Sequence, residues 1–168
     1  GAQSESTSVE NKESREPAQA ARKHLAETTK LLKRAVKSIE VSGKALVTDV
    51  PITYLGYVNR DTGVIEEPGH PLDGVPIKDT VLIYPKGSGS TVAPFVLMGL
   101  IYTGFGPMAI VNRDVCPLTL PAASLLGVPY AHGFRDDPTI RVNTGDDVSL
   151  TLSDGEVSLR VEARSTED

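Results

Sequence analysis

Apolar residues follow two different spacings along the 168-residue chain, one typical of a helix and one typical of strands. Residues 1–16 contain few apolar side chains, and we expect them to form a disordered tail. Pro17 is suited to the first turn of a helix. The apolar positions that then recur at helical spacing are Leu25, Leu32, Val36 and Ile39. We therefore predict a helix over about 17–38, within an N-terminal helix and linker region of residues 17–40.

From residue 41 the pattern changes to short apolar segments separated by turns. Residues 41–50, 79–85 and 108–112 are predicted strands. Residues 92–102 are apolar nearly all round, which predicts a buried helix with Pro94 in its first turn. A second, short helix is predicted over 120–127.

The alternation of apolar and polar residues is clearest near the C-terminus. The apolar positions are Val148, Leu150 and Leu152, followed by Val157, Leu159 and Val161. Asp154 and Gly155 lie between these two runs and predict a hairpin with a type I′ turn. Together these elements predict one compact α/β domain over residues 41–164.

The charge pattern narrows the classes of partner. The net charge is −5, and the basic cluster at residues 30–37 is more typical of a solvated helix face than of a nucleic-acid patch. No apolar run approaches the ~20 residues of a membrane span, and the N-terminus lacks a signal-peptide pattern. We therefore expect a cytoplasmic protein without nucleic-acid or membrane partners.

Cys116 is the single cysteine of the sequence. One thiol excludes an internal disulfide and also a self-contained iron–sulfur or structural zinc site, because such sites typically take about four ligands. We expect no metal to be held by this chain alone, so a cofactor of that kind would be held mainly by another chain. Cys116 itself is interpreted as a small buried apolar residue.

The sequence "KGSGST", residues 86–91, interrupts the apolar pattern between the strand at 79–85 and the helix at 92–102. Its glycines predict unusual dihedral angles or a close approach of the backbone to another group. Free N–H groups at a helix start, with the hydroxyls of Ser88, Ser90 and Thr91, would bind a phosphate or carboxylate. The loop is not a P-loop, because Lys86 precedes the glycines. A plain helix N-cap at Ser88 or Ser90 is the alternative.

The remaining polar residues give weaker indications. His24 is expected to be solvated on the N-terminal helix, and His70 lies in the turn-rich stretch "GHPLDG", where a surface position is expected. His132 either faces a cleft or ends a strand.

Three stretches, taken in order, resemble the small subunit or swivel domain of the aconitase X family. They are "PITYLGYVNRDTGVIEEPGHPLDG", "TVLIYPKGSGSTVAPFVLMGL" and "GPMAIVNR". The resemblance covers about residues 41–161 and leaves the N-terminal 40 residues outside. It implies a swivelling β/β/α domain that packs against a large subunit or domain holding an iron or iron–sulfur centre, with the active site between the two. This chain would then be a hydro-lyase component that is active only with that partner.

The resemblance also implies roles for the loop. Ser90 takes the place of the catalytic serine, the base that removes a proton from the carbon next to the substrate carboxylate. We expect substrate contacts from Lys86, Gly87, Ser88, Gly89 and Thr91. Aconitases proper continue with Arg-Glu, where this chain has Val92 and Ala93. The substrate carboxylate must then be bound by backbone N–H groups, by Lys86 or by the partner.

Members of the family dehydrate small hydroxy acids, and two substrates are open. The first expectation is cis-3-hydroxy-L-proline, the substrate of bacterial members. The alternatives are 5-phosphomevalonate, the substrate of archaeal members, and a non-catalytic anion-binding module of the same fold.

Overall fold

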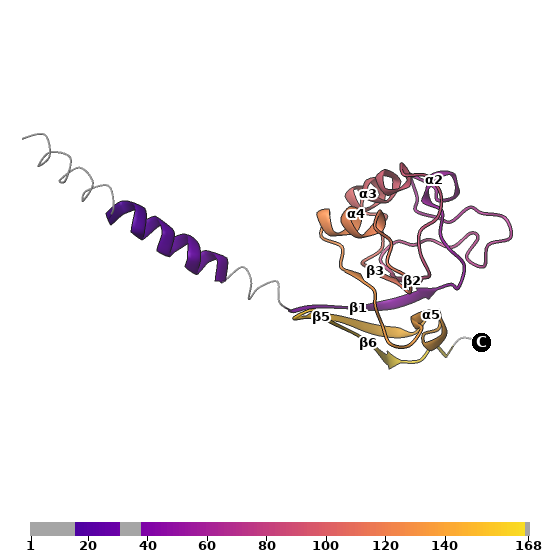
Figure 1. Cartoon of the computed structure of the whole chain (residues 1–168). Helices are drawn as coiled ribbons and strands as arrows, with labels where there is room; N and C mark the ends of the chain where they lie inside the picture. The colour runs from indigo at the N-terminus through magenta and orange to yellow at the C-terminus, as the bar shows by residue number, and fades with distance from the viewer. Residues whose placement is uncertain (1–15, 31–37, 167–168) are drawn as a thin grey trace, which may run out of the picture. The chain divides into compact units, whose positions relative to one another are not determined.

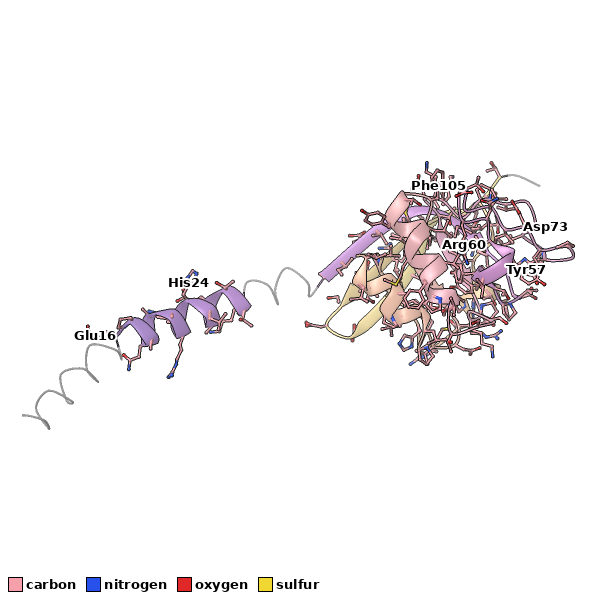
Figure 2. All side chains as sticks on the ribbon, turned by 90° about the horizontal axis from the view of Figure 1, so that it is seen from above. Glu16, His24, Tyr57, Arg60, Asp73 and Phe105 are labelled. Carbon is pink, nitrogen blue, oxygen red and sulfur yellow. The ribbon has the colours of Figure 1, made fainter. Side chains whose placement is uncertain are left out.

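The computed structural model describes residues 16–30 and 38–166, and the chain divides into the units Gly1–Ser38 and Ile39–Asp168. In the first unit, residues 16–30 form a helix whose side chains, including that of His24, are nearly all exposed (Figure 2). Except for Glu16, which is helical, the predicted tail lies outside the described residues, as do Leu32 and Val36. The predicted helical stripe is wrong at Ile39, because that residue lies in a strand.

The described part of the second unit contains one six-stranded sheet in the order β4-β3-β2-β1-β5-β6. The strands are β1 (Ser38–Val47), β2 (Val81–Tyr84), β3 (Ala109–Asn112), β4 (Tyr130–Ala131), β5 (Asp147–Ser153) and β6 (Glu156–Ala163). The helices are α2 (Tyr54–Tyr57), α3 (Ala93–Thr103), α4 (Thr119–Leu125) and α5 (Pro138–Arg141). Strands β1 to β4 pair in parallel, so their carboxyl ends meet at one edge of the sheet.

Strands β2 and β3 are buried on both faces, as the continuous apolar runs of their sequences require. Leu82 and Ile110 pack with the buried side chains of α3 and α4 on one face. Val81 and Val111 pack on the other face with Val148 of β5. Figure 1 shows α3 and α4 on one side of β1, with the β5–β6 hairpin on the other. This unit therefore has α3 and α4 over one face of a sheet that curls back over its own second face.

Most predicted elements are confirmed, with shifts at their ends. Strand β1 runs from Ser38 to Val47 rather than over 41–50, because the hydroxyl of Thr48 accepts a hydrogen bond from the Val50 amide and turns the chain. Helix α3 ends at Gly104, whose φ of 87° lets its amide bond the last helical carbonyls. The expectation that this helix is buried all round is wrong, since Phe95 and Tyr102 are 68% and 85% exposed.

The C-terminal hairpin is confirmed in position and in turn type. Ser153 pairs with Glu156, and both residues between them have positive φ, 46° at Asp154 and 79° at Gly155. Positive φ at both central positions is the geometry of a type I′ turn. Separately, no helix within residues 16–30 and 38–166 has the length and apolar character needed to cross a bilayer.

Candidate functional site

The Gly–Ser loop, residues 86–91, begins one residue after Pro85 at the carboxyl edge of the sheet and leads into α3. Ile52 holds it from one side. The Ile52 amide donates to the Lys86 carbonyl at 3.2 Å, and the Ser88 amide donates to the Ile52 carbonyl at 2.9 Å. The loop is therefore fixed by backbone pairing, and the N–H group of Ser88 is already used within the protein.

The surroundings favour glycine at both positions of the loop. Gly89 has a φ of +99°, and a Cβ atom there would lie 3.0 Å from Cγ2 of Thr53. A Cβ atom at Gly87 would lie 3.1 Å from Oγ1 of Thr119 and 3.5 Å from Sγ of Cys116. The expectation of unusual dihedral angles or close approach is thus confirmed, one reason at each glycine.

Ser90 lies at the turn that leads into α3. Its Oγ accepts a hydrogen bond from the Val92 amide at 3.1 Å, and its carbonyl accepts one from the Ala93 amide at 3.0 Å. The side chain is exposed, so the hydroxyl can still reach another molecule. An amide that donates to Oγ favours negative charge on that oxygen.

A small cavity of about 40 Å³ opens beside the loop. The loop residues that line it are Gly87, Ser88, Gly89 and Ser90. Tyr54 closes it from the side of α2, and Cys116 and Thr119 close it from the side of α4. The structure therefore brings four of the six predicted site residues to one cavity, whereas Lys86 and Thr91 are exposed beside it.

Two tyrosines beneath the loop were not predicted from the sequence as part of the site. The hydroxyl oxygens of Tyr54 and Tyr84 are 2.6 Å apart, and their rings meet edge to face. Burial raises the pKa of both phenols well above the ordinary value, so both are uncharged at neutral pH. Tyr54, which lines the cavity, therefore forms a neutral, hydrogen-bonded pair with Tyr84 behind it.

Cys116 differs from the small buried apolar residue expected. Its thiol is partly exposed in the cavity wall and accepts a hydrogen bond from the Thr119 hydroxyl at 3.1 Å. Burial opposes ionisation, yet the Thr119 hydroxyl and the backbone amides of Thr119 and Gly87 outweigh it and lower the pKa of the thiol. The sulfur therefore acts as a hydrogen-bond acceptor shared by the loop and α4.

A second buried polar network lies behind Cys116. The amide side chain of Asn112, which is fully buried, accepts a hydrogen bond from the Tyr130 hydroxyl at 2.7 Å and donates to the Tyr84 carbonyl at 3.3 Å. The Tyr130 oxygen in turn accepts from the Cys116 amide at 3.0 Å. Burial raises the pKa of Tyr130 to about 12, so its phenol keeps the proton that it donates.

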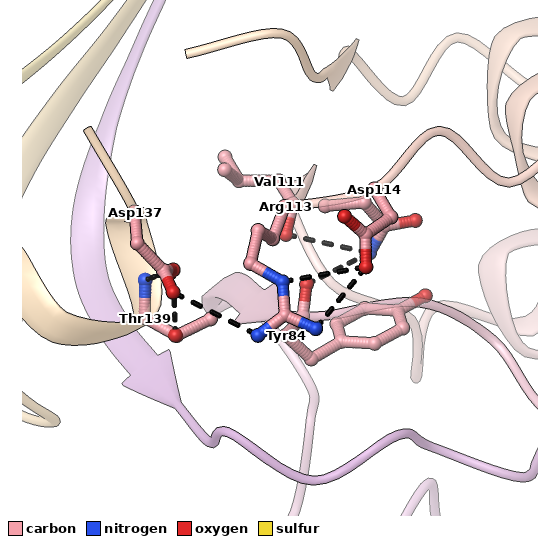
Figure 3. Close-up of polar contacts among 7 residues, drawn as sticks. Tyr84, Val111, Arg113, Asp114, Asp137 and Thr139 are labelled. Atoms are coloured by element: carbon pink, nitrogen blue, oxygen red, sulfur yellow. Dashed lines mark hydrogen bonds and ion pairs between the residues drawn. The ribbon is translucent and has the colours of Figure 1, made fainter. Parts of the chain in front are cut away.

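Arg113, directly after β3, lies between two carboxylates (Figure 3). Its guanidinium donates to Oδ2 of Asp114 at 3.1 Å and lies 3.7 Å from Oδ2 of Asp137. Oδ1 of Asp137 accepts from the amide and the hydroxyl of Thr139. The charge of Arg113 is thus paired within the protein, and the side chain links the end of β3 to the start of α5.

His70 is buried, so its expected surface position is wrong. Its Nδ1 accepts a hydrogen bond from the Leu72 amide at 3.0 Å, and Nε2 then donates to the Pro51 carbonyl at 3.1 Å. The ring fastens the turn-rich stretch to the residue before Ile52. His132, by contrast, is exposed just after β4.

Comparison with known proteins gives one consistent result. A family model described as the aconitase X swivel domain matches residues 30–159, beginning earlier than the resemblance over 41–161 suggested. The phosphomevalonate dehydratase small subunit of Methanocella arvoryzae is 36% identical over 70% of this chain and 89% of its own length. The protein of the same name from Pyrococcus horikoshii is 31% identical over 79% and 97%.

A solved structure shows the same fold. The holo form of aconitase X from Thermococcus kodakaraensis matches with a TM-score of 0.65 and 25% identity, over 73% of this chain and 91% of that one. The predicted swivel fold is therefore confirmed.

Proposed function

This chain belongs to the aconitase X swivel-domain family, and from that premise we propose that it is the small subunit of a phosphomevalonate dehydratase in which Ser90 is the general base. The names of the two relatives support 5-phosphomevalonate, which was the alternative substrate. Neither name supports cis-3-hydroxy-L-proline, the first expectation.

The observation that carries the proposal is the position of Ser90 at the rim of a small cavity and at the start of α3. In a dehydration of this kind the base takes a proton from the carbon next to the carboxylate. The electrons of that C–H bond form the C=C bond, the C–O bond to the neighbouring hydroxyl breaks, and the oxygen leaves as water after taking up a proton. A serine acts as base only where its alkoxide is stabilised. The Val92 amide supplies one direct hydrogen bond for that purpose, and the positive end of the eleven-residue α3 adds to it.

The other loop residues are suited to bind the anionic groups of the substrate. The side chains of Ser88 and Thr91 are exposed, and among the described residues Lys86 has no ion-pair partner within 4.0 Å. Since Ser88 uses its amide to bond Ile52, we assign it a contact through its hydroxyl. Lys86 provides the positive charge that a substrate with a carboxylate and a phosphate requires.

The residues present do not fit an iron–sulfur centre. The chain has one thiol, and in the described ranges no three His, Cys, Asp or Glu side chains gather as a metal site requires. We therefore derive no step through such a centre and expect it in the large subunit. The proposal accordingly requires an assembly in which the large subunit completes the cavity beside Ser90.

Reconstitution with the matching large subunit tests this function. We expect turnover of 5-phosphomevalonate. NMR spectra measure it through the formation of the C=C bond as the hydroxyl is lost. Ser90→Ala should lower kcat at least ~10²-fold, the usual cost of removing a catalytic base, without loss of assembly. Ser124→Ala, an exposed serine on α4, is the matched control and should behave as wild type.

Near-normal turnover by Ser90→Ala would show that Ser90 is not the general base. Turnover of cis-3-hydroxy-L-proline without turnover of 5-phosphomevalonate would overturn the substrate. Binding of phosphate without turnover of either would favour the non-catalytic module.

A further inference from the structure

Residues of the segment 116–119 line one wall of the cavity, and the segment contacts the Gly–Ser loop at Gly87. Gly87 packs closely against this segment: a Cβ atom there would lie 3.1 Å from Oγ1 of Thr119 and 3.5 Å from Sγ of Cys116, and the Gly87 amide bonds the Cys116 sulfur. Whatever fixes segment 116–119 therefore also fixes the first glycine of the loop.

Tyr130 fixes that segment. It comes from β4, two strands away from β2, and reaches the cavity wall from behind through its hydroxyl. That hydroxyl makes two contacts at once, accepting from the Cys116 amide at 3.0 Å and donating to Oδ1 of Asn112 at 2.7 Å.

Asn112 completes the connection to the strand that carries the loop. It lies at the end of β3, pairs in register with Tyr84 at the end of β2, and donates to the Tyr84 carbonyl. The Tyr130 hydroxyl is thus joined to the loop along two routes, through Asn112 to the strand before it and through Cys116 to Gly87.

We propose that Tyr130 is a positioning residue of the dehydration site, which holds segment 116–119 against Gly87 and so sets the place of Ser90. The inference rests on the proposed function, because a displaced Ser90 would lower the rate of the proposed reaction. Tyr130 does not line the cavity, so we assign it no contact with substrate. Its action is mechanical, through Asn112 and Cys116.

The two contacts explain why a hydroxyl is needed at this position. In Tyr130→Phe the ring remains, but the Asn112 oxygen and the Cys116 amide each lose a partner. Buried polar groups without partners rearrange or admit water, and segment 116–119 is then free to move away from Gly87. A displacement of ~1 Å at a reacting group can lower a rate by ~10²-fold, so even a partial shift is measurable.

The test uses the complete small chain assembled with its large subunit. For Tyr130→Phe we expect kcat to fall about tenfold, while KM for 5-phosphomevalonate and the affinity of assembly stay near wild type. Amide hydrogen exchange of the full small chain should become faster over residues 86–92 and 116–119, and remain unchanged in β5 and β6. Thr119→Val, which removes the hydroxyl that bonds Cys116, should shift exchange and kcat in the same direction.

Tyr102→Phe, on the exposed side of α3, is the control and should change neither measurement. Wild-type kcat and loop exchange in both Tyr130→Phe and Thr119→Val would overturn the positioning role. A uniform rise in exchange across the sheet would also overturn it, since it would reveal a general loss of stability. If wild type has no activity, or Ser90→Ala keeps it, the proposed function fails, whereas the exchange measurement still decides whether Tyr130 holds the loop.

Discussion

At the scale of single residues, the candidate site combines an exposed serine with uncharged phenols that lie beneath and behind it. Tyr54, Tyr84 and Tyr130 all have pKa values raised by burial, and their hydroxyls bond one another or Asn112. Each folded-state pKa lies above the ordinary value of 10. Their contribution to stability is therefore complete below about pH 10 and is lost as the pH rises through the folded-state values.

This difference predicts steep alkaline unfolding. The free energy of unfolding should fall above about pH 10, by up to ~1.4 kcal/mol per pH unit for each phenol that stays protonated in the native state. Tyr54→Phe should make that fall shallower, because one of the phenols is gone, at a cost of ~1 kcal/mol at pH 7 for the lost hydrogen bond. Urea unfolding at pH 7 to 11 measures both effects. Tyr102→Phe, exposed on α3, should keep the wild-type slope, and an unchanged slope in Tyr54→Phe would contradict the assignment.

At the scale of elements, the short apolar runs predicted β2 and β3, and the turn residues Asp154 and Gly155 predicted the hairpin. These signals are local, since the types of neighbouring residues indicate both burial on two faces and positive φ. The two-residue β4 and the Tyr54–Tyr84 contact were not predicted, because pairings between distant segments leave no periodic trace. His70 was misplaced for the same reason, since its partner Pro51 lies 19 residues away.

For the site, the sequence indicated the loop and its glycines but not its surroundings. Gly87 and Gly89 were singled out by type, whereas the groups that crowd them come from residues 53, 116 and 119. The cavity could therefore be expected at the loop, but its walls could be found only in the folded structure.

Asp146 connects the start of β5 to the C-terminal residues. We predict that the stability of this corner of the domain is lost in acid. Its buried carboxylate accepts hydrogen bonds from the amides of Asn143 and Ser165 and from Arg164. Burial alone would raise its pKa, but these donors lower it below the ordinary 3.8. The stabilisation is therefore present above about pH 4 and is lost as the pH falls through the lowered value.

Asp146→Asn should cost ~2 kcal/mol at pH 7, because one donor then meets the amide NH₂ group. It should also flatten the loss of stability below pH 4, measured by urea unfolding across pH 2–7. Asp73→Asn, on an exposed turn, is the control. Equal acid sensitivity in wild type and Asp146→Asn would show that the corner does not titrate as described.

At the scale of the whole molecule, the helix of residues 16–30 precedes the family match, which begins at the last residue of that helix. Leu25 on this helix is 66% exposed. A lone helix of this length is marginal in water and is usually stabilised by packing. We expect the large subunit to supply that packing, as an extension of the proposed function.

Deleting residues 1–37, which spares β1, should leave the Tm of the small chain unchanged and weaken its assembly about tenfold. That loss equals ~1.4 kcal/mol, near the lower range for burial of one leucine. Titration calorimetry with the large subunit measures it. Leu25→Glu should reproduce much of the effect, whereas Ala20→Glu on another side of the helix should not. A lower Tm of the shortened chain would instead indicate that the helix packs on its own domain.

The loop between Ile52 and the segment 116–119 has a consequence for synthesis of the chain. Its two supports are encoded on either side of it, and Tyr130 follows later still. During translation, β1 and β2 can emerge and pair while the loop still lacks one wall, because contacts between distant residues form after local ones. The proposed dehydration site therefore cannot be complete before residue 130 has been synthesised, and a nascent chain stalled before that residue would carry Ser90 without the contacts that Tyr130 makes.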